Sequence, residues 1–125
     1  MATFTLNKQE KLRGNNIFNQ IVSRGNIFHN GALKICWIMA KNQLFPAKVA
    51  FSIPKRYIKL ATKRNLLKRR LLEIYRLYKN KFYSQLNDKN LKIQLLIIYT
   101  NDDIKPYKEL ENILIESLQK LISKI

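Results

Sequence analysis

Residues 61–83 read ATKRNLLKRRLLEIYRLYKNKFY, and their apolar and basic side chains recur at helical spacing. At about 100° per residue, one side of such a helix is an apolar stripe made of Leu67, Leu71, Ile74, Tyr78 and Phe82, with Tyr75 at its edge. The opposite side carries Asn65, Arg69, Arg76 and Lys79, and Arg64 and Lys68 lie along one border. This stretch therefore predicts a long helix that buries one face in a core and presents a cationic face.

The charge of the whole chain is concentrated around this helix. The 125 residues carry 24 Lys and Arg against 8 Asp and Glu, a formal net charge of +16, and residues 55–81 contain eleven of the basic and one of the acidic side chains. A hydrophobic fraction of 46% supports a core, so we expect a single domain over residues 1–125 with a flexible segment at 1–8. A block of positive charge on a folded domain predicts a polyanionic partner, foremost nucleic acid.

Apolar runs predict strands on both sides of the long helix. Residues 33–39 and 47–53 precede it, and residues 92–99 follow it as a nearly continuous apolar run that indicates burial on both faces. A strand, a helix and a further strand in this order can form a βαβ crossover. We therefore expect an α+β sandwich in which helices cover a small sheet.

Two further helices complete the predicted order. Asn15 and Asn16 are suitable caps for a first helix, which Gly25 would end. Pro106 can open a final helix, whose apolar residues at helical spacing are Leu110, Ile113, Leu114, Leu118, Leu121, Ile122 and Ile125. The predicted chain order is thus helix, strands, helix, strand, helix.

The chain carries no pattern typical of a membrane span, a secretory signal or a catalytic centre. Its apolar runs are far shorter than the about 20 residues that cross a bilayer, and Cys36 is the single cysteine, so we expect a cytoplasmic protein. The closest acidic pairs, Asp102–Asp103 and Glu109 with Glu111, fit a turn and a solvent-facing helix, and the lone His29 fits a structural role. We therefore expect no catalytic residue and no metal site in the protein itself.

The segment from Lys55 to Glu73 resembles the central motif of the bacterial ribonuclease P protein subunit. In that family a strand ends in a turn of a small residue, Lys and then Lys or Arg, and a helix with the pattern Arg-Asn-Arg-x-Lys-Arg-x-x-Arg-Glu follows. Lys55 and Arg56 match the turn, and Arg64, Asn65, Lys68, Arg69, Arg70 and Glu73 match the helix. The motif departs from the family at Leu66 and Leu72, where Arg is usual. The resemblance extends over most of the chain, from about residue 8 to about residue 122.

This resemblance implies a fold and a function. The family fold is an α+β, αβββαβα sandwich with a small mixed sheet and a βαβ crossover, like the second domain of ribosomal protein S5. In the family, a catalytic RNA subunit removes the 5′ leader of precursor tRNA in a reaction that needs Mg²⁺. The protein binds that RNA and the single-stranded leader, with no tightly bound cofactor, no membrane and no obligate protein partner.

The residues that the resemblance and their own chemistry assign to these tasks fall into two sets. Binding of the catalytic RNA is assigned to Lys55, Arg56, Lys63, Arg64, Asn65, Lys68, Arg69 and Arg70. A leader-binding cleft between the first helix and the sheet would be lined by Phe18, Val22, Cys36 and Tyr57, although the family commonly has aromatic residues where Val22 and Cys36 stand. Phe18 also fits a core position, because it lies on the apolar stripe of the first helix.

Two other hypotheses fit the same charge pattern. A ribosomal or other structural RNA-binding module needs the same basic surface on the same kind of fold. A basic helix that binds an anionic membrane or an acidic protein is the second alternative. The second alternative requires a free apolar helix face, whereas the apolar face of residues 61–83 is predicted to lie in the core.

Overall fold

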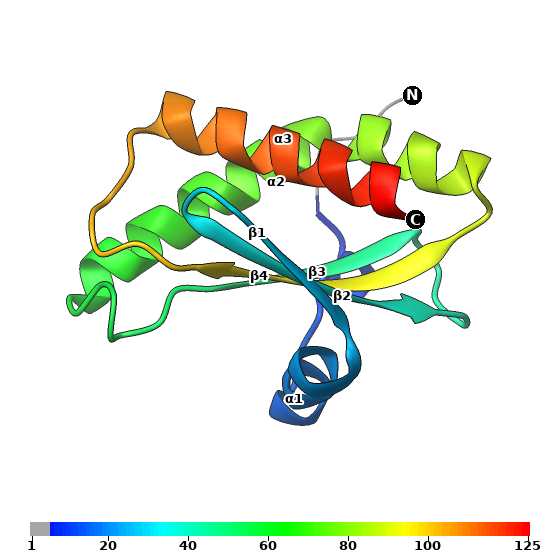
Figure 1. Ribbon diagram of the computed structural model, residues 1–125, viewed down its shortest axis with the longest axis horizontal. Coiled ribbons are helices and arrows are strands. Elements are labelled where there is room, and N and C mark those ends of the chain that lie inside the picture. Colours follow the sequence, from blue (N-terminus) through cyan, green and yellow to red (C-terminus); the bar gives the residue numbers. More distant parts are fainter. Residues whose placement is uncertain (1–5) are drawn as a thin grey trace.

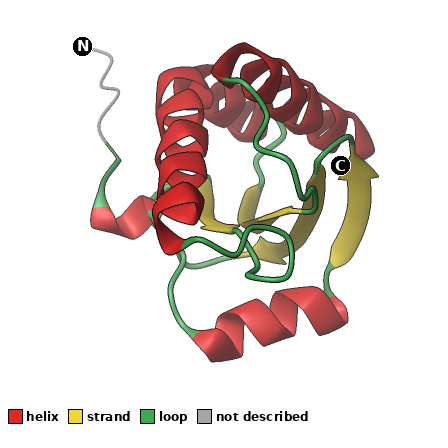
Figure 2. Ribbon diagram, turned by 90° about the vertical axis from the view of Figure 1, so that its left-hand side faces the viewer, coloured by secondary structure: helices red, strands yellow, loops and turns green. Residues whose placement is uncertain are grey.

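The computed structural model describes residues 6–125, in which one sheet has helices on both of its faces (Figure 1). In chain order the elements are η1 (Lys8–Glu10), α1 (Asn15–Arg24), β1 (Asn26–Asn30), β2 (Leu33–Ala40), β3 (Ala47–Ser52), α2 (Ala61–Asp88), β4 (Lys92–Tyr99) and α3 (Tyr107–Lys124). The helices α2 and α3 lie side by side over one face, and α1 lies on the opposite face, so that the sheet forms the middle layer (Figure 2).

The four strands are arranged in the order β1-β2-β4-β3. Neighbours pair antiparallel except β3 and β4, which run parallel and are joined by α2. This is the expected βαβ crossover, and the α+β fold with the element order αβββαβα is confirmed. The strand β1 has the sequence NIFHN, which contains no strong apolar run, so the apolar pattern alone did not predict it.

The central strand β4 connects two cores of unequal size. Ile93, Leu95 and Ile97 are fully buried in the large core beneath α2 and α3. On the other face, Leu96 belongs to a small cluster with Leu12, Ile21 and Cys36, which α1 covers. The prediction that residues 92–99 are buried on both faces is therefore confirmed, and the buried positions of α3 follow the predicted stripe.

The helix α1 lies where the sequence predicts it and ends at Gly25 as predicted, but its start has another cause. Asn15 and Asn16 lie within the helix, Gly14 is the N-cap with a φ of 106°, and no side chain in the described residues caps α1. The prediction of side-chain capping is thus wrong. Gly25 ends the helix where the chain passes close to β2, because a Cβ there would lie 2.8 Å from the carbonyl oxygen of Trp37.

The helix α2 buries a face that shifts around the helix along its length. Leu67, Leu71 and Ile74 are buried, as the apolar stripe predicts. Tyr75, predicted at the edge of the stripe, is fully buried, and Lys79, predicted on the cationic face, is only 2% exposed. The prediction for Lys79 is wrong, because a segment from the start of the chain covers that side of α2.

This covering segment, residues 6–13, runs between the edge strand β3 and α2 and is called the N-terminal strap below. Glu10 and Asn7 form a capping box around η1, in which the Asn7 amide donates to Glu10 Oε2 over 2.6 Å. Lys11 bridges to Val49 of β3, and the Leu12 amide donates to the Val49 carbonyl oxygen over 2.9 Å. The predicted flexible segment 1–8 falls largely on residues 1–5, which lie outside the described residues.

Candidate nucleic-acid interface

The first half of α2 presents cations to solvent. Leu67 and Leu71 are fully buried, and because successive helical positions differ by about 100°, they direct Lys68 and Arg69 away from the core. Both of these cations are exposed, as are Lys63 and Asn65. Arg64 and Lys68 lie four positions apart, a spacing at which like charges on a helix repel one another by a few tenths of a kcal/mol per pair. A bound polyanion would remove that repulsion.

Three hollows adjoin at Leu72 and together form one surface, which we call the basic groove. The first, of about 510 Å³, runs along α2 and is lined by Thr62, Asn65, Lys68, Arg69 and Leu72. The second, of about 310 Å³, connects α2 with α1 and β3, and its lining includes Lys11, Arg13, Phe18, Lys68 and Leu72. The third, of about 300 Å³, is lined by Leu6, Lys11, Arg69, Leu72, Glu73 and Arg76. The cations of the basic groove are therefore Lys11, Arg13, Lys68, Arg69 and Arg76.

Two of the predicted RNA-binding arginines contact the protein's own loops. Nη1 of Arg64 donates to the carbonyl oxygens of Ile58 and Lys59 over 3.0 and 2.6 Å. Nη1 of Arg70 donates to the carbonyl oxygen of Lys105, which precedes α3, over 3.5 Å. Both arginines are half-buried, and neither lines the three hollows of the basic groove. Arg64 thus fastens the connection from β3 to α2, which sequence reasoning did not anticipate.

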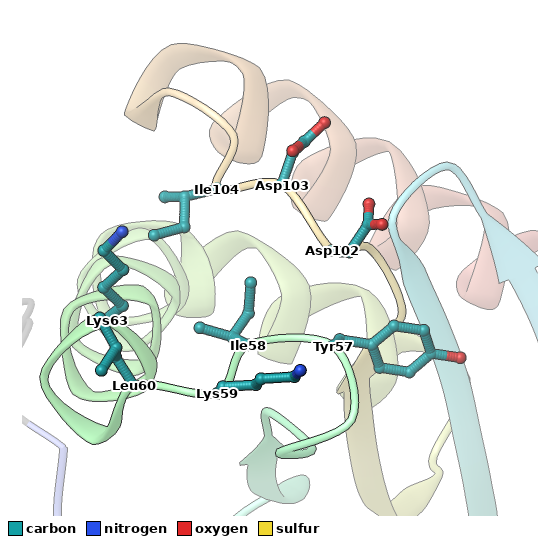
Figure 3. Close-up of a pocket in the computed structure, with 8 residues that line it drawn as sticks. All are labelled: Tyr57, Ile58, Lys59, Leu60, Lys63, Asp102, Asp103 and Ile104. Atoms are coloured by element: carbon teal, nitrogen blue, oxygen red, sulfur yellow. The ribbon is translucent and has the colours of Figure 1, made fainter.

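The turn after β3 forms a separate site. Lys55 and Arg56 are exposed, and the Arg56 guanidinium lies 5.0 Å from the centroid of the Tyr57 ring. Figure 3 shows Tyr57, Lys59 and Lys63 on one side of a pocket of about 370 Å³, with Asp102 and Asp103 on the other. Tyr57 packs against the large core, whereas Phe18 packs against the small cluster beneath α1. The structure therefore does not bring Tyr57 to the hollow that Phe18 lines.

The remaining predicted leader-binding residues differ in what they offer to a ligand. Phe18 is half-buried and lines the basic groove. Val22, on the same helix, is 43% exposed but lies outside the groove lining. Cys36 is fully buried beneath α1, and burial raises the pKa of its thiol, with a smaller opposing effect from Lys34. Cys36 therefore packs under α1 and presents no surface to a ligand.

Within residues 6–125 no three His, Cys, Asp or Glu side chains are grouped so that they could hold a metal ion. None of the described helices combines the length and the apolar character needed to cross a bilayer.

Comparison with known proteins assigns the chain to a family. A sequence profile of the Ribonuclease P family matches residues 6–124. The chain belongs to the ribonuclease P protein family. It is 29% identical over 119 residues to the ribonuclease P protein component of Finegoldia magna, covering 95% of this chain and 96% of that protein. It is 23% identical over 125 residues to the ribonuclease P protein component of Porphyromonas gingivalis, covering 99% and 91% of the two chains.

Solved structures share the fold of this ribonuclease P protein. The Staphylococcus aureus RNase P protein superposes with a TM-score of 0.72 at 18% identity, covering 90% of this chain and 94% of that one. The Thermotoga maritima RNase P protein gives a TM-score of 0.71 at 19% identity, covering 89% and 96%. Family membership places this protein in an endoribonuclease complex that processes tRNA.

Lys11 and Arg13 line the basic groove, although no motif in the sequence points to them. They lie in the N-terminal strap, more than fifty positions before Lys68 in the chain, and line the hollow that Lys68 also lines. The sequence does show an excess of basic residues before α1, because this segment contains Lys8, Lys11 and Arg13 but one acidic residue, Glu10. The pairing of the strap with β3 is what turns that excess into part of the groove.

Proposed function

We propose that this protein is the RNA-binding subunit of a ribonuclease P holoenzyme, in which it binds the catalytic RNA and the single-stranded 5′ leader of precursor tRNA. The observation that carries the proposal is the basic groove, in which five cations surround the apolar side chains of Leu72 and Phe18. Cations that bind phosphates release counterions, which favours binding of a nucleic-acid backbone.

The two ends of the basic groove suit two kinds of RNA contact. Along α2, Lys68 and Arg69 can neutralise phosphates of a folded RNA without reading its sequence. Beside α1, the half-buried ring of Phe18 lies in the same hollow as Lys68. A flat apolar face next to a cation is the arrangement on which unpaired bases stack while their phosphates are bound. We therefore assign the structured RNA to α2 and the leader to the hollow at Phe18.

The Mg²⁺ of the proposed reaction is assigned to the RNA. A carboxylate site for Mg²⁺ in the protein would need grouped oxygen ligands, and Asp102 and Asp103 instead line a pocket together with Lys59 and Lys63. Mg²⁺ bound to the RNA would supply the hydrolytic chemistry, and the protein would contribute binding and orientation. We expect the complex to act in the cytoplasm on precursor tRNA without an obligate protein partner.

Reconstitution tests the assignment of chemistry. The purified protein should leave precursor tRNA intact at any Mg²⁺ concentration, and the protein together with a bacterial ribonuclease P RNA should remove the leader at an Mg²⁺ concentration where the RNA alone is slow. Cleavage by the protein alone would show that the division of roles is wrong. Crosslinking in cell extract distinguishes the ribonuclease P role from a ribosomal role. A ribosomal role requires enrichment of ribosomal RNA over ribonuclease P RNA.

A substitution at Phe18 tests the assignment of the leader. Replacement of Phe18 by Leu keeps an apolar side chain on α1 but removes the aromatic face, whose stacking is worth about 1–3 kcal/mol per base. The holoenzyme should then bind precursor tRNA more weakly while its affinity for mature tRNA, which has no leader, is unchanged. Val22→Ala is the matched control, because Val22 lies on the same helix outside the groove lining. Equal losses for both tRNAs would contradict the assignment.

A further inference from the structure

One ion pair of the described residues is buried almost completely. Nζ of Lys79 lies 2.8 Å from Oε1 and 3.0 Å from Oε2 of Glu10, and the two side chains are 3% and 1% exposed. The other ion pairs within residues 6–125 join positions three or four apart at the protein surface. The Glu10–Lys79 pair instead joins residues 69 positions apart, and it links the N-terminal strap to α2.

Further contacts surround this buried pair. Glu10 Oε2 also accepts a hydrogen bond from the Asn7 amide, and Nζ of Lys79 lies 5.9 Å from the centroid of the Tyr83 ring. Beyond Tyr83 lies the buried hydroxyl of Tyr75, 3.2 Å from the Tyr83 hydroxyl. Neither charge can reach water while the strap stays in place. Loss of one partner would leave the other as an uncompensated buried charge, which is strongly unfavourable.

The residues next to Glu10 in the strap belong to the basic groove. Lys11 lines two of its three hollows, and Arg13 lines the hollow that reaches Phe18. Their side chains are exposed, so they have no buried contacts that fix their position. The position of both cations depends on the docking of the strap, which Glu10 secures on α2 and the Leu12 amide secures on β3.

We propose that the buried Glu10–Lys79 pair is a positioning element for RNA binding, which holds Lys11 and Arg13 at the basic groove. The inference rests on the proposed function, because it takes RNA as the ligand of that groove. It has an unusual consequence. Removal of the negative charge of Glu10 makes the protein more cationic, and yet it should weaken the binding of a polyanion.

The physical reason is that the buried Lys79 ammonium loses its counter-charge in a Glu10→Gln variant and is then stabilised by contact with water. Lys79 itself lies on a helix that is anchored in the core by Phe82 and Leu86. Release of the strap exposes Lys79 to water, whereas movement of α2 would disrupt the large core. Release of the strap also withdraws Lys11 and Arg13. Each lost phosphate contact lowers affinity by about fivefold at 0.1 M salt and reduces the slope of log K against log salt by about 0.7.

The decisive measurement is the salt dependence of binding to ribonuclease P RNA for the full chain. Glu10→Gln should weaken binding at 0.1 M salt by about fivefold or more and lower the salt slope by about 0.7–1.4. Glu116→Gln is the matched control. It also removes one acidic charge, but from an exposed pair with Lys120 on α3, outside the groove lining, whose side chains are 59% and 49% exposed. Its binding should be unchanged.

Replacement of both charged residues by apolar ones distinguishes the effect of strap position on RNA binding from the effect of net charge. Lys79→Met should behave like Glu10→Gln, since Glu10 is then the lone buried charge. The double variant Glu10→Met with Lys79→Met should restore the wild-type affinity and slope, because apolar residues of similar volume can replace a buried ion pair without loss. Hydrogen exchange at the Leu12 amide should be fast in the single variants and slow in the double variant. A structural role without positioning would lower Tm but leave the salt slope of the folded protein unchanged.

Each outcome bears on one proposal. The positioning role would be overturned if hydrogen exchange showed that the strap is released in Glu10→Gln while the salt slope of RNA binding stayed equal to that of the wild type. If both single variants fail to fold, Lys11→Gln with Arg13→Gln remains, because these exposed side chains can be changed without disturbing the core. An unchanged slope in that variant would overturn the inference by itself. A wild-type protein that binds the RNA without any salt dependence would instead refute the proposed function.

Discussion

Substitution of Arg64 tests whether this residue binds RNA or stabilises the fold. The sequence motif places Arg64 among the RNA-binding residues, next to Asn65. In the structure, Nη1 of Arg64 donates to the carbonyl oxygens of Ile58 and Lys59 over 3.0 and 2.6 Å. We predict that Arg64→Gln mainly reduces stability, while Lys68→Gln mainly reduces RNA binding.

The expected magnitudes follow from these contacts. A hydrogen bond to a charged group contributes about 1.5–3 kcal/mol. The two bonds of Arg64 share one nitrogen of a half-buried side chain, so we expect Arg64→Gln to lower the free energy of unfolding by about 2 kcal/mol in total. For a chain of this size that corresponds to a decrease of roughly 6–10 °C in Tm. Lys68 is exposed, and Lys68→Gln should change the free energy of unfolding by less than about 0.5 kcal/mol.

The assay combines urea denaturation with titration of ribonuclease P RNA at several salt concentrations. Arg64→Gln should shift the urea midpoint and leave the salt slope of binding within error of the wild type. Lys68→Gln should keep the midpoint and reduce the slope by about 0.7–0.9, the value for one phosphate contact. An Arg64→Gln protein with wild-type stability and a reduced slope would refute the assignment of Arg64 to the loop.

Three other substitutions or conditions test the fold. Leu71→Ala should lower the free energy of unfolding by about 2–5 kcal/mol, because Leu71 is fully buried in the large core and its truncation leaves a cavity; wild-type stability in urea would show that the site is not packed as described. Gly25→Ala should destabilise the protein, because the new Cβ would lie 2.8 Å from the carbonyl oxygen of Trp37; an unchanged Tm would contradict this close approach. Burial raises the pKa of the Tyr83 hydroxyl and that of Tyr75, so both groups keep their protons in the folded state above the ordinary tyrosine pKa of about 10. Their contribution to stability is complete below about pH 10 and is lost as the pH rises further, so Tm should fall steeply above that pH and tyrosinate absorbance of these two groups should appear only with unfolding.

Strong local patterns made most of the fold predictable. The strand β4 was predicted at its observed bounds, Lys92–Tyr99, because a nearly continuous apolar run suits a central strand and little else of that length. The start of α2 and the buried stripe of α3 followed from helical periodicity. The strand β1 was missed by pattern, because an edge strand needs few apolar residues and is formed by pairing with β2.

The candidate site was predictable only in part. Lys68 and Arg69 lie in the basic groove, as their place opposite the apolar stripe implies. Cys36 and Tyr57 do not join Phe18 on one surface, because Cys36 is buried beneath α1 and Tyr57 packs on the other face of the sheet. Assignment of residues to a motif fixes neither the face of the sheet nor the depth at which each side chain lies.

The sequence by itself determined that this protein is a small α+β domain with a long helix, a central buried strand and a block of positive charge beside the core. These features follow from composition and periodicity, which act over a few residues and hold in any context. Only the tertiary structure decided what each cation does. Lys79 follows the same helical spacing as Arg69 and Arg76, yet it is buried against Glu10, because a segment 69 positions earlier in the chain packs on that side of α2. Burial of a charge depends on which distant element covers it and whether that element brings a counter-charge, and neither can be read from the helix alone.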